Sequence, residues 1–200
     1  MLSSPVTISD HPSPAWSNQW LHPSTGNPFT LKFCQSDELS AGDLQACLDL
    51  VEETSGEHYK SSSRGWHPGS KRREMREADM RYILVKDESD VVKGFTSLMP
   101  CYEEGEPVIY CYEIHLKPEL QGTGLGRTLM SFLETIAANV PTVNKVMLTC
   151  FLCNTKGLEF YKRIGFEKDE ISPEPRKLRF GKVFEPDYVI LSKVVGRGNA

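Results

Sequence analysis

The sequence contains no run of the roughly eighteen apolar residues that a membrane-spanning helix requires. Its N-terminus lacks the charged start and apolar block of a secretory signal, so we expect none. Basic residues are not in excess, because 23 Lys and Arg stand against 27 Asp and Glu, a net charge of -4. These absences argue against membrane insertion and against a broad nucleic-acid-binding surface, and we expect neither partner.

The cysteines are scattered along the chain, and the pattern of a metal or disulfide site is missing. Only Cys150 and Cys153 are close, and neither a second pair nor a histidine couplet accompanies them. We therefore expect free thiols, no metal, and a reducing compartment, the cytoplasm and nucleus. The six cysteines are Cys34, Cys47, Cys101, Cys111, Cys150 and Cys153.

The composition is that of one globular domain, with 39% hydrophobic and 25% charged residues among 200. We place this domain at residues 29–195, followed by a short C-terminal tail at 196–200. Residues 1–28 hold five prolines and form either a disordered tail or a segment docked through Trp16 and Trp20. We expect a monomer.

Periodicity predicts alternating strands and helices. The strands are expected at residues 29–33, 81–86, 91–99, 108–116, 145–151 and 188–195, with a bulge at Gly94. Ser40 should cap a helix that ends at residues 54–56, and a polar loop at 58–66 should lie on the substrate side. Further helices are expected at 70–80, where the charged run is a solvated face, and at 125–138 and 154–163. This order predicts an α/β fold, a mixed sheet with helices on both faces.

The centre of the chain is a glycine-rich turn at residues 121–127, Gln-Gly-Thr-Gly-Leu-Gly-Arg, between a strand and a helix. Backbone amides at a helix start, uncrowded by side chains, form an anion site, and the helix dipole favours a phosphorylated ligand. The turn is neither a Walker loop nor a dinucleotide fingerprint, because Arg127 stands where each needs another residue.

In this context the Gln-x-x-Gly-x-Gly turn resembles the acetyl-CoA pyrophosphate loop of the GNAT superfamily of N-acetyltransferases. Residues 110–113, 145–149 and 187–192 further resemble the N-alpha-acetyltransferase D family. That resemblance implies a mostly antiparallel sheet whose middle strands splay apart. It also implies acetyl-CoA as co-substrate. The implied partners are the N-terminal serines of histones four and two-A, which read Ser-Gly-Arg-Gly, with nascent chains at the ribosome as a second possibility.

Glu113 is the candidate general base, since a charged residue in an apolar strand needs a reason and the family has a catalytic glutamate here. A solvent-facing glutamate is the alternative. We expect Glu113 to face the same side as Cys111. The family's second acidic residue is replaced by Cys101, and only Glu103 shares its face, so a second carboxylate stays open.

The resemblance also assigns a peptide pocket and a cofactor site. Tyr112 is a second catalytic candidate, and its joint approach with Glu113 requires a bulged or splayed strand. The peptide pocket would be formed by Tyr59, Tyr112, Thr149, Ser172 and Tyr188. Cofactor contacts are expected from Ile114, His115, Leu116, Gln121, Gly122, Thr123, Gly124, Leu125, Gly126, Arg127 and Asn154. A lysine or small-amine acetyltransferase, and an acyl-CoA-binding module without turnover, remain alternatives.

Overall fold

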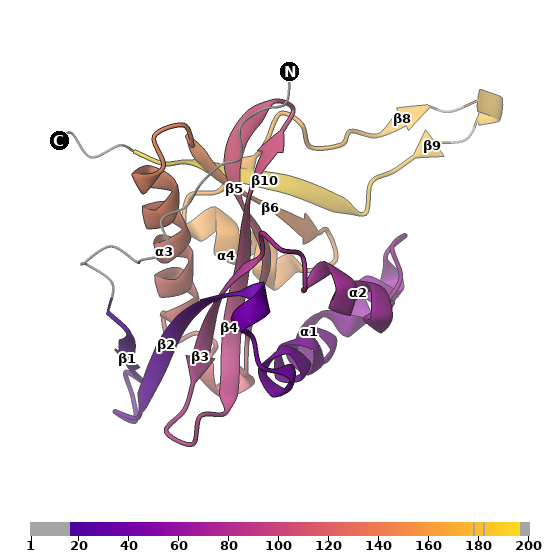
Figure 1. Cartoon of the computed structure of the whole chain (residues 1–200). Helices are drawn as coiled ribbons and strands as arrows, with labels where there is room; N and C mark the ends of the chain where they lie inside the picture. Colours follow the sequence, from indigo (N-terminus) through magenta and orange to yellow (C-terminus); the bar gives the residue numbers. More distant parts are fainter. Residues whose placement is uncertain (1–16, 178, 182, 197–200) are drawn as a thin grey trace.

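The fold is built on one large, mostly antiparallel sheet, whose strands are labelled in Figure 1. The structure, a computed structural model, describes residues 17–177, 179–181 and 183–196. Eight strands lie in the order β1-β2-β3-β4-β5-β6-β10-β7. Their bounds are β1 Gln19–Leu21, β2 Pro28–Gln35, β3 Arg81–Lys86, β4 Val92–Glu103, β5 Glu106–Leu116, β6 Lys145–Phe151, β7 Glu167–Lys168 and β10 Tyr188–Val194. Two short strands, β8 (Arg176–Lys177) and β9 (Val183–Phe184), pair separately in a projecting hairpin.

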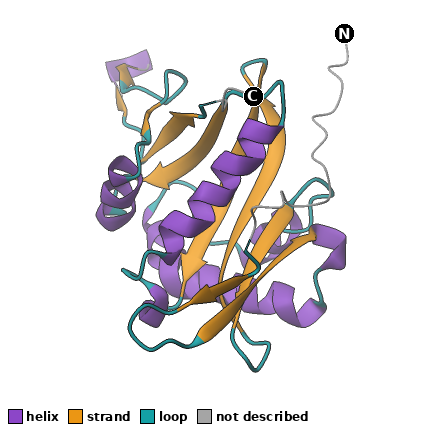
Figure 2. Ribbon diagram, turned by 90° about the vertical axis from the view of Figure 1, so that its left-hand side faces the viewer, coloured by secondary structure: helices purple, strands orange, loops and turns teal. Residues whose placement is uncertain are grey.

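Helices cover both faces of the sheet, as the sequence predicts (Figures 1 and 2). One face carries α1 (Ala41–Ser61) and α2 (Pro68–Glu74), and the other carries α3 (Leu125–Asn139) and α4 (Thr155–Arg163). Each face has its own apolar core, one around Leu48, Val51 and Phe95 and one around Leu129, Leu133 and Leu148. The sheet is therefore the middle layer of three, and any site between its strands is sheltered on both sides.

The structure corrects two helix boundaries. The Ser40 hydroxyl caps α1 as expected, accepting from the Asp43 amide at 2.9 Å, but α1 continues through Gly56 to Ser61. Glycine inside a helix costs about 1 kcal/mol, and the packing of Tyr59 against Phe151 offsets this beyond Gly56. Residues 58–61 of the expected loop are thus helix and 62–66 remain a loop, and α2 ends at Glu74, well before residue 80.

The two middle strands, β5 and β6, separate halfway along their length. β5 and β6 pair in parallel only at residues 109–111 with 146–148. Beyond Cys111, β6 keeps its partner β10 along its whole length, while β5 keeps β4. The splayed middle strands are confirmed, and they leave space between β5 and β6 for a ligand.

A bulge in β5 reverses which face its side chains occupy. Cys111 is paired with Leu98 and Glu113 with Ser97, so that Tyr112 is an extra residue without a partner on β4. Cys111 packs into the α3 core, whereas Glu113 contacts residues of α1 and α2. The expectation that Glu113 faces the same side as Cys111 is therefore wrong, because one inserted residue shifts the alternation. The bulge foreseen for Tyr112 and Glu113 is present.

The N-terminal segment adds an edge strand. β1 pairs with β2, and the Trp20 ring lies 5.9 Å from that of Phe29 between centroids. Trp16 lies outside the described residues. Among the helices that the structure describes, none combines the length and the apolar character needed to cross a membrane.

Candidate active site

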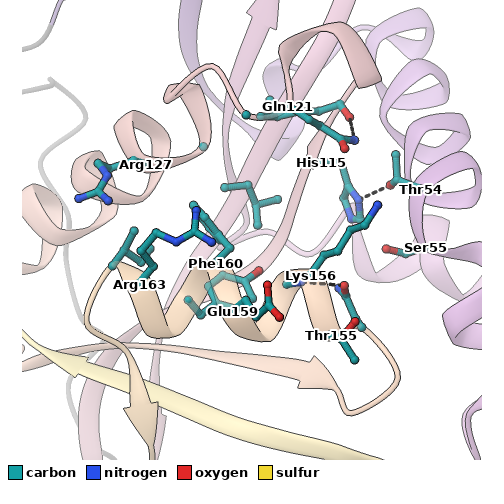
Figure 3. A pocket seen from close by; sticks show the side chains of 18 of the residues that line it. Thr54, Ser55, His115, Gln121, Arg127, Thr155, Lys156, Glu159, Phe160 and Arg163 are labelled. Carbon is teal, nitrogen blue, oxygen red and sulfur yellow. Dashed lines mark hydrogen bonds between the residues drawn. The ribbon is translucent and has the colours of Figure 1, made fainter.

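A large open hollow lies where the splayed strands face the starts of α3 and α4 (Figure 3). Its volume is about 960 Å³. Three segments far apart in the sequence form its walls: the C-terminal half of α1, the glycine-rich turn, and α4. The hollow is the natural place for an elongated ligand that passes between β5 and β6.

The glycine-rich turn presents a bare helix start to this hollow. Gly124 is the N-cap of α3 with φ of 92°, and Gly122 has φ of 72°, both in the left-handed region that favours glycine. Among the described side chains none caps the helix at Gly124, and the Leu125 amide makes only a long contact of 3.5 Å with the Thr123 hydroxyl. The other amides of the first turn are therefore left for an anionic ligand, as the sequence predicts.

Basic side chains complete a phosphate-binding wall. Arg127, Lys156 and Arg163 line the large hollow, and Figure 3 shows Arg127 and Arg163 on the side opposite His115. Cations on extended side chains suit the several phosphate groups of a CoA molecule. The residues present fit this group. Lys156 and Arg163 were not expected from the sequence, because lysine and arginine on a helix are usually solvated.

Most of the predicted cofactor residues reach this hollow. Those that line it are Ile114, His115, Leu116, Gln121, Gly122, Gly124, Gly126, Arg127 and Asn154. Thr123 and Leu125 do not: the Thr123 hydroxyl donates to the Leu120 carbonyl at 2.6 Å, and Leu125 is fully buried in the core. Asn154 also caps α4, since its side chain accepts from the Gly157 amide at 2.9 Å.

A second, smaller hollow of about 80 Å³ adjoins the first. It lies between β5 and β6 and is lined by Tyr112, Glu113 and Thr149, among others. His115 and Tyr161 belong to the walls of both hollows. A ligand in the large hollow can therefore present its end to groups in the small one.

Glu113 is the chemical centre of the small hollow, and it is only 7% exposed. One carboxylate oxygen accepts from Lys71 Nζ at 2.8 Å and from the Tyr59 hydroxyl at 3.0 Å. The other lies 2.5 Å from His115 Nε2. Burial raises the pKa of Glu113, but the charges of Lys71 and His115 outweigh it and lower the pKa to about 2. The carboxylate is thus ionised at any physiological pH, and the solvent-facing alternative does not hold.

Tyrosines surround this carboxylate. The Tyr59 ring packs at 5.4 Å from that of Trp66, and burial followed by the charge of Glu113 raises its pKa. Tyr110 shares a hydrogen bond of 2.6 Å with the Thr149 hydroxyl across the gap between β5 and β6. Tyr112 packs against Tyr110 and is 36% exposed, which makes it the most exposed of these three tyrosines.

Two residues predicted for the peptide pocket line neither hollow. Ser172 is buried, and its hydroxyl accepts from the Ile190 amide at 3.1 Å, which is a structural contact. Tyr188 is the first residue of β10. The guanidinium carbon of Arg64 lies over the Tyr188 ring, 5.3 Å from the ring centre. Neither is among the described residues that line the two hollows. Tyr188 instead helps to hold the α1–α2 loop, whose Ser63 amide donates to the Asp187 carboxylate.

The Cys101 thiol does not replace the second acidic residue of the family as a charged group. Burial and the neighbouring Glu103 raise the pKa of the Cys101 thiol to about 12, so it stays neutral. Its sulfur lies 3.9 Å from a Glu103 oxygen, as strand alternation predicts. Glu113 is therefore the carboxylate that the structure places inside the small hollow.

Sequence reasoning missed Lys71 and Thr54. Lys71 lies in the charged run interpreted as a solvated face, yet its side chain is only 10% exposed. Thr54 lies where α1 was expected to end, and its hydroxyl is 2.6 Å from His115 Nδ1 (Figure 3). Nothing in the sequence separates Lys71 from its charged neighbours, because its inward direction depends on where α2 packs.

Comparison with known proteins agrees with this geometry. Residues 46–166 match the family model described as acetyltransferase (GNAT) family, whose members use acetyl-CoA. A relative from Saccharomyces cerevisiae, named N-alpha-acetyltransferase 40, is 30% identical over 161 residues. The match covers 68% of this chain but 56% of the relative, so the chain spans little more than half the length of that curated protein.

Solved structures share the fold at low identity. NAA60 from Arabidopsis thaliana, solved with a bisubstrate analogue, is 12% identical with a TM-score of 0.57, over 84% of this chain and 100% of that one. GCN5 from Tetrahymena is 9% identical with a TM-score of 0.61, over 84% and 98%. The glycine-rich turn, the splayed strands and the family match over more than half its length together establish that this chain belongs to the acetyltransferase (GNAT) family.

Proposed function

We propose that this protein is an N-alpha-acetyltransferase that transfers acetyl from acetyl-CoA to the N-terminal serine amine of histones four and two-A. Glu113 is the general base. The observation that carries the proposal is a buried, ionised carboxylate in the small hollow, directly beside the large hollow that fits the cofactor. The relative named N-alpha-acetyltransferase 40 supports the class of reaction.

The chemistry requires a neutral amine, because an ammonium has no lone pair. The amine nitrogen forms a bond to the thioester carbonyl carbon, the carbon–sulfur bond breaks, and its electron pair leaves with sulfur. The N–H proton is accepted by Glu113, directly or through one water. An α-amine with an ordinary pKa of about 7.7–8.0 is far easier to deprotonate than a lysine at about 10.4.

The large hollow contributes position. Amides of the α3 start and the basic wall hold the phosphate end, so that the acyl end points to the gap between β5 and β6. Burial, followed by the nearby Cys101 and carboxylates including Glu74 and Glu103, raises the pKa of Tyr112. Its phenol therefore keeps its proton and can donate it to the departing thiolate.

An acidic surrounding supports a basic peptide substrate. The negative groups that act on Tyr112, a residue of the small hollow, include Glu74, Glu77 and Glu103. A chain beginning Ser-Gly-Arg-Gly would bring its arginine into this field. The histone partners, the second possibility of nascent chains at the ribosome, a monomeric state and residence in cytoplasm and nucleus belong to the same proposal.

The test uses two peptides of sequence Ser-Gly-Arg-Gly-Lys, one with a free N-terminus and one with it blocked. With acetyl-CoA, the free peptide should be acetylated on its α-amine, as located by mass spectrometry, and the blocked peptide should react far more slowly. Equal rates on the blocked copy would make this a lysine acetyltransferase. Tight CoA binding without transfer to either peptide, or to a polyamine, would make it an acyl-CoA-binding module.

A further inference from the structure

Among the basic side chains of α2, that of Lys71 points at Glu113 in the small hollow. Its Nζ lies 2.8 Å from a Glu113 oxygen, 2.5 Å from a Glu74 oxygen and 5.0 Å from the centre of the Tyr59 ring. Its neighbours on the helix point elsewhere, since Arg72 donates to Gln45 and Arg73 to Ser70. Two carboxylates and an aromatic face thus surround a cation that is almost excluded from water.

A buried ammonium such as that of Lys71 needs partners of opposite charge. Burying an ammonium is unfavourable by several kcal/mol unless opposite charge compensates it. Here burial lowers the pKa of Lys71, but Glu113, Tyr59 and Glu74 more than reverse this and the pKa is raised. Lys71 therefore stays charged, and it is too strongly held to act as an acetyl acceptor itself.

The fixed charge has two consequences for the small hollow. It holds Glu113 as a carboxylate in one orientation, because Lys71 and Tyr59 share one oxygen and His115 faces the other. In addition, an amine hydrogen-bonded to the shared oxygen would lie within about 6 Å of Lys71 Nζ. A like charge at that distance disfavours protonation of the incoming amine.

We propose that Lys71 is a positioning residue of the amine site, whose ammonium fixes the Glu113 carboxylate and favours a weakly basic α-amine over a lysine side chain. The inference rests on the proposed function, in which Glu113 accepts the proton. A cation already paired with Glu113 leaves little net attraction for a second one. An amine that is easily neutral enters, whereas a lysine ammonium meets repulsion.

Other titratable groups also face this pair. Tyr59 on α1, Glu74 on α2, His115 on β5, Tyr82 on β3 and Tyr161 on α4 all act on Glu113 or Lys71. Burial raises the pKa of each of the three tyrosines, so they stay neutral in the working range. Lys71 is then the cation paired with one oxygen of Glu113, and His115 Nε2 lies at the other oxygen.

The test compares Lys71→Met with Lys71→Arg, and uses Arg73→Met as the matched control on the exposed side of the same helix. Methionine keeps the length and removes the charge, while arginine restores it. With the free Ser-Gly-Arg-Gly-Lys peptide, Lys71→Met should lower kcat about 10-fold at neutral pH and move the acidic limb of the pH profile upward by one to two units. The ratio of α-amine to lysine acetylation should fall about 10-fold.

Lys71→Arg should recover most of both effects, and Arg73→Met should match the unaltered protein. Affinity for CoA by calorimetry should change little in all three. The melting temperature should fall in Lys71→Met alone, because the buried Glu113 carboxylate loses its ammonium partner. A Lys71→Met protein that is folded, with an unmoved pH profile and an unchanged amine preference, would overturn the proposal.

A readout that does not need turnover separates this inference from the proposed function. The Glu113 carboxyl carbon, labelled with ¹³C, should not titrate between pH 8 and 4 in the unaltered protein, and should titrate in that range in Lys71→Met. If the unaltered protein acetylates no α-amine, the proposed function fails while this measurement still decides the role of Lys71. If Glu113 stays ionised to pH 4 without Lys71, the inference is wrong whatever the activity.

Discussion

The large and the small hollow, which share His115 in their walls, are formed by different chemical groups. The large hollow relies on backbone amides at the start of α3 and on basic side chains that project into an open space. The small hollow relies on side chains alone, brought from α1, α2, β5 and β6 to a buried carboxylate. The first needs flexibility of φ at a few glycines, and the second needs four elements to pack in register.

This difference decides how each half should respond to substitution. Changes in the large hollow should weaken ligand binding and leave the chemical step intact. Changes in the small hollow should slow the chemical step and leave CoA binding intact. The following substitutions test whether the division is real.

Glu113→Gln should have the largest effect. The amide keeps the shape of the side chain but cannot accept a proton, so kcat should fall about 10²–10⁴-fold. CoA affinity by calorimetry should stay within a few-fold. Glu103→Gln, near Cys101 but outside the small hollow, is the control: kcat should stay close to that of the unaltered protein, and only the peptide KM should rise because one charge of the acidic surrounding is lost. Unchanged turnover in Glu113→Gln would remove this residue from the mechanism.

Gly124→Val should have the next largest effect, on the other side of the division. A β-branched residue at φ of 92° is strained, and its side chain stands where the phosphate approaches. CoA affinity should fall at least about 10-fold, with kcat at saturation little changed. Gly105→Val is the matched control, because Gly105 has φ of 86° and equally open space but lies in the hairpin between β4 and β5. Equal loss of CoA binding in both variants would show that strain alone is responsible.

Tyr110→Phe and Thr149→Val should have the smallest effect. Each removes one partner of a single hydrogen bond across the splayed strands, worth about 0.5–1.5 kcal/mol. The peptide KM should rise a few-fold in either variant, and the double variant should add little to the larger single effect. Full additivity would show that the two hydroxyls contact the peptide separately.

The same division explains what the sequence could predict. The strand before the turn, the α3 start and β6 are local patterns, and Gly122, Gly124 and Arg127 lie where the sequence places them. The identity of Glu113 as the buried carboxylate also follows from its apolar strand.

Other features depend on packing between distant segments. Lys71 is one of several similar charges in its run, and only the position of α2 against β5 turns it inward. The role of Thr54 was missed because the helix was expected to end at residues 54–56. Tertiary packing overrides the low helix propensity of Gly56, and α1 continues beyond it. Ser172 and Tyr188 were carried over by resemblance. Ser172 accepts from the Ile190 amide and Tyr188 lies under Arg64, and their contact with the peptide stays a prediction.

The unpaired Tyr112 gives β5 an uneven tolerance to changes in length. The two-residue hairpin at residues 104–105 is exposed, and an insertion there would only lengthen a loop. Removing Tyr112 would close the bulge and leave Cys111 opposite Leu98 and Glu113 opposite Ser97, so the carboxylate would still face α1 and α2. Removing a residue from the regular part of the strand would instead shift the register, and the neighbouring side chains would change faces. A family member without the extra residue would therefore keep its base on this strand and would lose only the bend and the phenol that the bulge supplies.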